Sequence, residues 1–416
     1  MNLHRFNTNV SIILNWYITK FSRDLCLPSL PAIAIALHTQ DRYVKYTVSF
    51  YFLGMGISRF FFTPLSDMFG RRHIILYSLP IFILGSALCT SAHSIEWFIA
   101  GRMMQALGIG CITALGWAMI GDVYGPEDST KALAYLSTFA MWAPALATTL
   151  GGHLQSAFGW QASFYFLTAS GLLLYIQTLF CLKETNLQLL PKTQIIKQVA
   201  KNYARLIVEP EYWRYIMTFS LTFSGTVVYY STAPFLFINT FHISPHTYGY
   251  FSFITVAGLI LGKFLAIRTT EKYSVDFTLL CGLFISSLGG ALMVLLALFC
   301  RTTHLWLNVA IILLPSMIYF LGNGVMSPTS KAGTVTLIPG TAGTAAALFG
   351  LMQGIASSAA GIASAYLPNH NGLGMGAMFC LISVLAMISL WIFSPKKLPP
   401  PAAPLSPPAK PSQPLQ

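Results

Sequence analysis

Charged residues are scarce in this chain of 416 residues: Asp, Glu, Lys and Arg make up 9% of it, whereas 55% is hydrophobic. Soluble domains carry about 25% charged residues, so the composition excludes an ordinary water-soluble protein. Acidic residues are the rarest, with 12 in the whole chain and none after Asp276. The net charge is +12, and the charged residues lie in short gaps between long uncharged runs. Because this arrangement is typical of a membrane protein, we expect no nucleic-acid partner.

The patterns that indicate metal or covalent chemistry are also missing. The 7 cysteines are scattered without a CxxC pair or a His/Cys cluster, so we predict neither a metal site nor a disulfide framework. No H-E-x-x-H or G-x-S-x-G motif occurs, and no group of acidic residues falls within one apolar run. We therefore expect a protein that is not an enzyme and that needs no cofactor.

Long apolar runs fill most of the chain. A helix of about 20 apolar residues crosses a bilayer, and we expect about twelve such spans in an all-α integral membrane protein. They lie near residues 9–36, 44–66, 73–92, 95–121, 131–153, 161–182, 213–239, 246–268, 276–299, 304–329, 343–366 and 373–394. The first carries Lys20, Arg23 and Asp24 and lacks a small-residue cleavage site, so we do not expect it to be a removable signal.

Most Lys and Arg residues fall in the gaps that follow even-numbered spans, whereas Arg42, Lys45 and Arg301 fall in the others. By the positive-inside rule this asymmetry places both termini in the cytoplasm. We expect an N-terminal bundle of six helices over residues 1–182 and a second over residues 213–394. Residues 183–212 form a basic cytoplasmic linker with an amphipathic helix, and the Pro-rich tail 395–416 is predicted to be disordered.

The stretch TPLSDMFGRRHIIL, residues 63–76, places Asp67, Arg71 and Arg72 in the narrow gap between the second and third spans. The arginines alone fit a positive-inside anchor. An acid beside them at a membrane boundary is best placed against cations or the N-terminus of a helix. Gly70 permits a tight turn between the two spans.

This stretch resembles the signature loop of the major facilitator superfamily, G-x-x-x-D-R-x-G-R-R, with Thr63 and Met68 in place of the first Gly and the first Arg. Four further segments resemble the bicyclomycin and chloramphenicol resistance branch of that superfamily, whose members are drug:proton antiporters. These are RDLCLPSLPAI (23–33), RMMQALGIG (102–110), GWQASFYF (159–166) and STAPFLF (231–237). The resemblance implies twelve transmembrane helices in two six-helix bundles.

The resemblance also implies a conformational latch at the loop between spans 2 and 3. Asp67 is then expected near the N-terminus of span 11, at residues 341–344, and Arg71 or Arg72 is expected to pair with Asp122. A channel would have no use for such a two-state latch. APALATTLGG (143–152) is similar to the antiporter motif of span 5, with Pro144, Gly151 and Gly152 present but Ala147 and Thr148 in place of its Gly-Pro pair.

Asp24 is the only acidic residue that the predicted topology places inside a span. An ionised group within a membrane is costly, so it should have a partner or a function. One interpretation is a neutralised pair with Lys20, four residues earlier on the same helix face. The other is a proton-coupling carboxyl, with Arg102, which matches the fourth-span arginine of the family, close to it.

Arg59 lies where relatives in the family usually have Gln. It either extends its charge to the membrane boundary or selects anionic substrates from within the central cavity. Other residues that we expect to line a substrate cavity are polar or aromatic and lie within spans, although packing is an alternative role for each aromatic one. They are Asn15, Trp16, Tyr17, Tyr51, Trp142, Tyr229, Tyr230, Asn323 and Gln353.

These observations predict a monomeric, proton-coupled secondary active transporter in the bacterial inner membrane. It would export small amphipathic molecules, as multidrug efflux proteins do, by alternating access across the lipid bilayer, with protons and a small-molecule substrate as its ligands. The alternative is a specific exporter, or a proton-coupled importer, of one metabolite or siderophore, including an anionic one.

Overall fold

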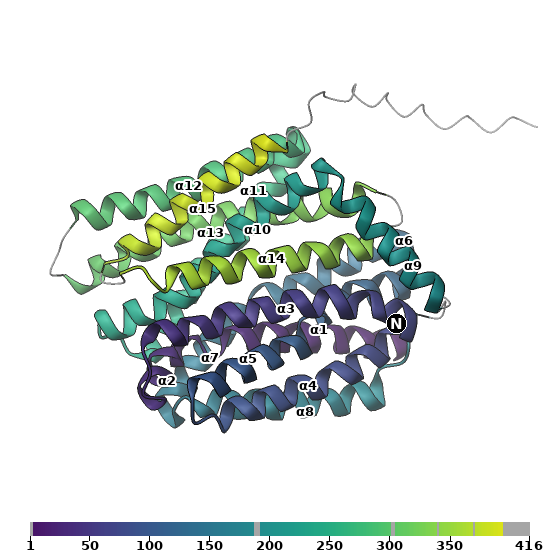
Figure 1. The fold of residues 1–416 in the computed structure, drawn as a ribbon, viewed down its shortest axis with the longest axis horizontal. Helices are drawn as coiled ribbons and strands as arrows, with labels where there is room; N and C mark the ends of the chain where they lie inside the picture. The colour runs from purple at the N-terminus through teal and green to yellow at the C-terminus, as the bar shows by residue number, and fades with distance from the viewer. Residues whose placement is uncertain (1–2, 187–191, 301–303, 339–340, 369–370, 394–416) are drawn as a thin grey trace, which may run out of the picture.

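The computed structural model describes residues 3–186, 192–300, 304–338, 341–368 and 371–393, and within these ranges it contains helices and no β-strand (Figure 1). The predicted tail 395–416 lies outside the described residues. The helices are α1 (Leu3–Asp24), η1 (Leu27–Ser29), α2 (Leu30–Ala36), α3 (Asp41–Phe69), α4 (Arg71–Thr90), α5 (Ile95–Ile109), α6 (Ile112–Met141), α7 (Ala143–Phe158), α8 (Gln161–Cys181), α9 (Lys192–Ile207), α10 (Pro210–Pro234), η2 (Phe235–Thr240), α11 (Pro245–Lys272), α12 (Val275–Phe299), α13 (Leu305–Thr336), α14 (Ala342–Ser364) and α15 (Leu373–Ile392).

In the described part of the chain, 11 helical segments are long and apolar enough to cross a membrane. The remaining predicted span, near residues 9–36, is present as α1, η1 and α2 in succession. It is interrupted after Asp24 because Pro28 and Pro31 follow closely and cannot donate backbone hydrogen bonds. The all-α membrane fold predicted from the sequence is confirmed, and its first span is a broken helix.

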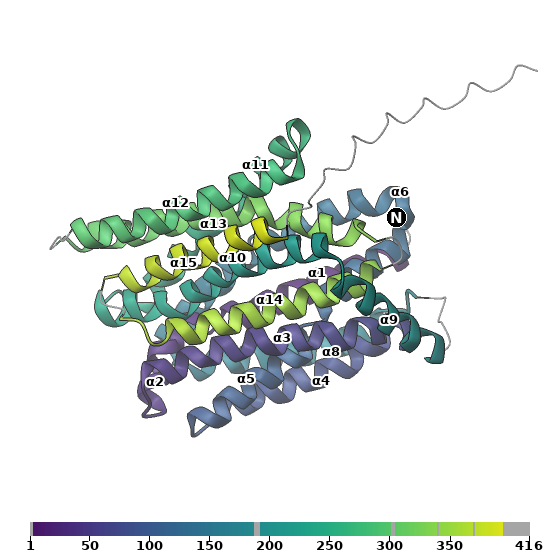
Figure 2. The same ribbon diagram turned by 45° about the horizontal axis from the view of Figure 1, so that its top comes forward.

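The helices form two bundles that lie side by side (Figures 1 and 2). In the first, α4 packs against α5 and α8, and α3 packs against α5. In the second, α13 packs against α11 and α12, and α15 packs against α10 and α12. The two bundles contact each other chiefly through α3 with α14 and through α7 with α11. Any site between the bundles is therefore framed by these four helices, together with α1 and α10.

Helices α3 and α14 run antiparallel in contact over most of their length. At one end the hydroxyl of Tyr46 donates a hydrogen bond to that of Tyr366, at 2.8 Å. Near the middle, a Cβ added to Gly56 would lie 3.0 Å from the carbonyl oxygen of Gly350 and 3.2 Å from the Cα of Gly354. Small residues at such positions let two helix backbones approach closely, which stabilises helix pairs in membranes.

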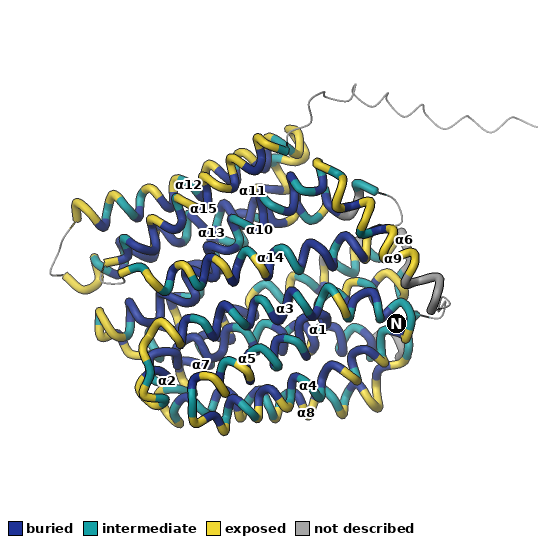
Figure 3. The backbone as a smooth tube through the Cα atoms, viewed as in Figure 1, coloured by how far each residue is buried: buried dark blue, intermediate teal, exposed yellow. Residues whose placement is uncertain are grey.

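The outer faces of the bundles are apolar. On α8, Leu173 and Phe180 are 68% and 79% exposed, and on α12 Phe284 and Phe299 are 65% and 79% exposed. Figure 3 shows that exposed backbone positions follow the outward sides of the helices, while the buried ones face the bundle interior. Large exposed apolar side chains on several neighbouring helices are suited to contact with lipid.

Two segments differ from the expectation. Helical backbone continues through residues 122–130 in α6, where a loop between the fourth and fifth spans was expected. Helix α9 is present in the linker, but it packs on the bundles. Tyr203 stacks on Phe60 of α3 at 4.8 Å and its hydroxyl donates to the Phe60 carbonyl oxygen at 3.2 Å. Burial raises the pKa of Tyr203, so the phenol stays a neutral donor.

Candidate functional site

A buried ion pair lies at the break in the first span. Asp24 is the last residue of α1 and is fully buried. Its two carboxylate oxygens accept hydrogen bonds from Nε and Nη2 of Arg23, at 2.5 and 2.6 Å. Of the two interpretations of Asp24, the neutralised pair therefore has Arg23 in the place suggested for Lys20, because the neighbouring arginine reaches both oxygens. An ionic group at a discontinuity within a span is a frequent feature of transport sites.

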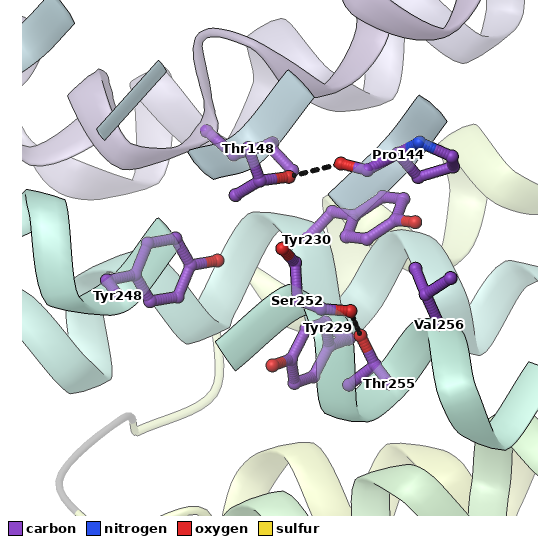
Figure 4. A pocket seen from close by; sticks show the side chains of 9 residues that line it. Pro144, Thr148, Tyr229, Tyr230, Tyr248, Ser252, Thr255 and Val256 are labelled. Carbon is purple, nitrogen blue, oxygen red and sulfur yellow. Dashed lines mark hydrogen bonds between the residues drawn. The ribbon is translucent and has the colours of Figure 1, made fainter. Parts of the chain in front are cut away.

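The ion pair lies beside Tyr230, one of the predicted cavity residues. The guanidinium of Arg23 is 5.4 Å from the centre of the Tyr230 ring, within cation–π range. Tyr230 in turn lines a small pocket between the two bundles (Figure 4). The residues of this pocket come from η1, α7, α10 and α11, and they are Leu27, Pro144, Thr148, Tyr229, Tyr230, Tyr248, Ser252, Thr255 and Val256.

The antiporter-like segment in α7 forms one wall of this pocket. Thr148 donates its hydroxyl to the Pro144 carbonyl oxygen at 2.9 Å (Figure 4). On the same helix, a Cβ at Gly151 would collide with the carbonyl oxygen of Leu25, and one at Gly152 would collide with that of Pro245. The two glycines thus let α7 touch both the broken first span and the start of α11. Ala147 and Thr148 replace the Gly-Pro pair of the family motif, but the close packing at Gly151 and Gly152 is still present.

Arg102 lies in the core of the first bundle, 1% exposed. It donates to the Ser22 carbonyl oxygen at 2.9 Å and to the side-chain oxygen of Gln105, and its guanidinium lies 4.1 Å from the Tyr51 ring centre. Its Nε and Nη2 have no hydrogen-bond partner among the described residues. Arg102 thus contacts α1 two residues before Asp24, while the ion pair described for Asp24 is with Arg23.

Arg59 and Gln353 connect the two bundles. Arg59 Nη1 donates to Gln353 Oε1 at 3.1 Å, and Arg59 Nε donates to the carbonyl oxygen of Gly110 at 3.2 Å. Arg59 is half-buried and Gln353 is buried. The arginine therefore lies at the contact of α3 with α14 and does not extend to a helix end.

The remaining candidates for the substrate cavity have different surroundings. Tyr51 is fully buried, and its hydroxyl donates to Ser22 Oγ at 2.8 Å. Asn15 is buried and donates to the Ser11 carbonyl oxygen at 2.8 Å. The ring centre of Tyr17 lies 6.1 Å from that of Phe21. Trp142 is 45% exposed, and its ring centre lies 6.3 Å from that of Phe253 in the other bundle.

The loop between α3 and α4 holds a cluster of charges. Arg71 pairs with Asp67 at 2.6 Å and with Asp122 of α6 at 3.4 Å, so the expected contact with Asp122 is present. Arg72 donates to the Leu179 carbonyl oxygen at 2.8 Å. Asp67 also lies at the start of α14: a Cβ added to Gly343 would be 3.9 Å from Asp67 Oδ2. The cluster thus joins the first bundle and reaches the second.

Glu184 is the member of this cluster that the sequence did not indicate. Its Oε1 and Oε2 accept hydrogen bonds from the backbone nitrogens of Arg71 and Arg72, at 2.8 and 3.1 Å. A carboxylate at the N-terminus of α4 satisfies free N–H groups and complements the helix dipole. Gly70 makes room for it, since Gly70 has φ +93° and any Cβ there would collide with Glu184. The sequence offered only one general signal for the role of Glu184, which is that an acid lies next to the end of a predicted span.

The comparisons with known proteins agree with this architecture. Residues 17–361 match the Major Facilitator Superfamily. The chain belongs to this superfamily. It is 27% identical over 334 residues to a bicyclomycin resistance protein homolog of Haemophilus influenzae, covering 80% of this chain and 82% of that one. It is 23% identical over 382 residues to multidrug resistance protein D of Escherichia coli strain K12, covering 92% and 94%.

Among solved structures, a D-xylose-proton symporter shares the fold with a TM-score of 0.75 and 16% identity, over 94% of this chain and 98% of that one. This member of the major facilitator superfamily is therefore a multi-pass membrane transporter of a small molecule and not an enzyme. The two relatives named above carry bicyclomycin resistance and multidrug resistance in their names.

Proposed function

We propose that this chain is a proton-coupled exporter of small amphipathic molecules. It works as a monomer by alternating access in the bacterial inner membrane, with both termini in the cytoplasm. The observation that carries the proposal is the buried Asp24 carboxylate at the break in the first span, beside a pocket that both bundles line. The resistance functions in the names of the relatives support export as the direction.

Protonation of Asp24 provides the coupling step. In the charged state Asp24 holds Arg23 through two hydrogen bonds. A proton on the carboxyl removes the ionic attraction, so Arg23 is released toward Tyr230 and the pocket. In an exporter the proton and the substrate compete, so bound substrate favours the ionised Asp24–Arg23 pair, and protonation of Asp24 favours release of the substrate. The membrane potential contributes about 2.3 kcal/mol per unit charge per 100 mV, which is enough to drive accumulation by roughly 50-fold.

The test is uphill transport by purified protein in liposomes under an imposed pH gradient, with wild-type protein compared with Asp24→Asn. We expect the variant to lose uphill transport and to keep exchange of labelled for unlabelled substrate, because exchange needs no net proton movement. Glu96→Gln, at an exposed acid in the first turn of α5, is the matched control and should transport normally. Undiminished uphill transport by Asp24→Asn would refute the coupling role.

A further inference from the structure

Four basic side chains from four helices of both bundles interact with one another. They are Lys20 of α1, Arg59 of α3, Lys263 of α11 and Lys331 of α13, and each is half-buried. We call them the basic cluster. Packing connects two of them across the boundary between the bundles: a Cβ added to Gly350 would meet the Arg59 side chain, and the adjacent Phe349 stacks with Phe219, whose ring centre lies 5.7 Å from Lys331 Nζ. Lys20 is repelled by Arg23, Lys331 and Lys263 and attracted by Asp24, and Lys331 is repelled by Lys263 and Arg59. The cluster therefore places positive charge on both sides of this boundary.

Nearby acids do not neutralise the basic cluster. Asp24 interacts with Lys20, but both its oxygens are taken by Arg23. In the second bundle the acids are Glu211 in the first turn of α10, Glu271, which is exposed, and Asp276, which pairs with Arg214 at 2.9 Å. None follows Asp276 in the sequence. None of the ion pairs found in the described parts of the chain includes a member of the basic cluster.

Like charges held together within a membrane protein are unfavourable without a counter-charge. A structural role alone would be met better by neutral residues, so the excess of positive charge indicates a negatively charged ligand. Arg59 shows that the cluster can bind oxygen acceptors, since it already donates to the Gln353 oxygen at 3.1 Å.

Aromatic rings lie next to the basic cluster. Lys331 Nζ lies 5.7 Å from the Phe219 ring centre. Phe219 stacks with Phe349 at 5.6 Å and contacts Phe223 at 5.8 Å. Phe223 lies 6.0 Å from Phe52 of the first bundle. Positive charge beside a row of rings is complementary to a molecule with an acidic group on an apolar or aromatic body.

We propose that the basic cluster binds the carboxylate of an amphipathic organic anion, whose apolar body packs on Phe219 and Phe223. The substrate class of the exporter is then organic acids, and not the cations or neutral compounds that a drug-efflux protein would also carry. This inference rests on the proposed transport function, but it does not depend on coupling through Asp24.

The test uses three probes with one ring system and different charges: 2-naphthoate, 2-naphthamide and 2-naphthylmethylammonium. Their binding to full-length protein in phosphatidylcholine nanodiscs is measured by calorimetry. We expect naphthoate to bind at least about tenfold more tightly than the other two, because charged hydrogen bonds are made only with the carboxylate. Equal binding of the amide or the ammonium compound would overturn the proposal.

Variants locate the site. Lys263→Gln and Lys331→Gln should each remove most of the preference for naphthoate, whereas Lys331→Arg should keep it. Lys272→Gln, at an exposed lysine in the last turn of the same helix as Lys263, is the matched control and should bind as wild type does. Preference unchanged in Lys331→Gln would overturn the proposal. Asp24→Asn should retain the preference for naphthoate, so failure of proton coupling and failure of anion binding can be told apart.

A second arm separates substrate from lipid as the source of the negative charge. Repeating the naphthoate titration in phosphatidylglycerol nanodiscs should give the same affinity. Naphthoate binding that is present in phosphatidylcholine but lost in phosphatidylglycerol would show that a lipid headgroup occupies the basic cluster, and this result would overturn the assignment to substrate.

Discussion

The Glu184 carboxylate occupies the space that a side chain at residue 70 would need. Gly70 also has a positive φ, +93°, that residues with a side chain adopt only with strain. The linker that follows the first bundle is therefore fixed to the start of α4 by a contact that depends on one glycine.

Replacing Gly70 with Ala should lower the free energy of unfolding of the purified protein by about 1–3 kcal/mol, because the backbone is strained and Glu184 is displaced. A lower thermal midpoint would report this change. The control is Gly121→Ala, because an added Cβ there meets nothing within 4 Å and Ala favours a helix. In a Glu184→Ala background the cost of Gly70→Ala should be smaller, since the colliding carboxylate is gone. Fully additive costs in this double-mutant cycle would contradict the contact.

Arg23 neutralises a fully buried carboxylate, so Arg23→Gln should be more harmful than its size suggests. Removing one partner of a buried ion pair costs about 3–5 kcal/mol. The double variant Arg23→Gln, Asp24→Asn should recover the thermal midpoint, because no unpaired charge remains, but should not recover uphill transport. A double variant as unstable as Arg23→Gln alone would show that Arg23 acts through other contacts.

Asp67 joins Arg71 and the start of α14, which suggests that it stabilises closure at this end of the bundles. Asp67→Asn keeps the shape of the side chain and removes its charge. We expect slower transport with normal insertion, since a hydrogen bond to a charged group is worth about 1.5–3 kcal/mol, although the 40% exposure of Asp67 reduces this value. Cysteine accessibility at positions between α3 and α14 should rise, and unchanged accessibility would argue against a latch.

The orientation in the membrane is tested with two exposed positions at opposite ends of the molecule. In a cysteine-free background, Lys197→Cys in α9 should be shielded from an impermeant thiol reagent in intact cells. Arg42→Cys in the first turn of α3 should be labelled. The reverse labelling pattern would place both termini outside the cell.

The spans were accessible from sequence because they follow from hydropathy, and the contact of Arg71 with Asp122 was implied by the resemblance to the superfamily's signature loop. Glu184 was not, since it lies more than a hundred residues from Gly70 along the chain and an acid in a basic linker resembles any solvated charge. Helical spacing suggested Lys20 as one partner of Asp24, but it could not show that the guanidinium of the adjacent Arg23 reaches both carboxylate oxygens. The basic cluster required the three-dimensional arrangement of four helices, none of which carries a distinctive charge pattern.

In the contact of α3 with α14, the glycines at 56, 350 and 354 bring the two backbones together near its middle, with Arg59 packed on Gly350. Because the backbones are closest there, this point can serve as a pivot between the bundles. On one side of this point lies the contact of Tyr46 with Tyr366, and on the other side Asp67 lies beside Gly343. A covalent crosslink between positions 46 and 366 would hold the bundles closed at that end and stop alternating access. A crosslink of equal length between positions 56 and 354 would leave the rotation of one bundle against the other free.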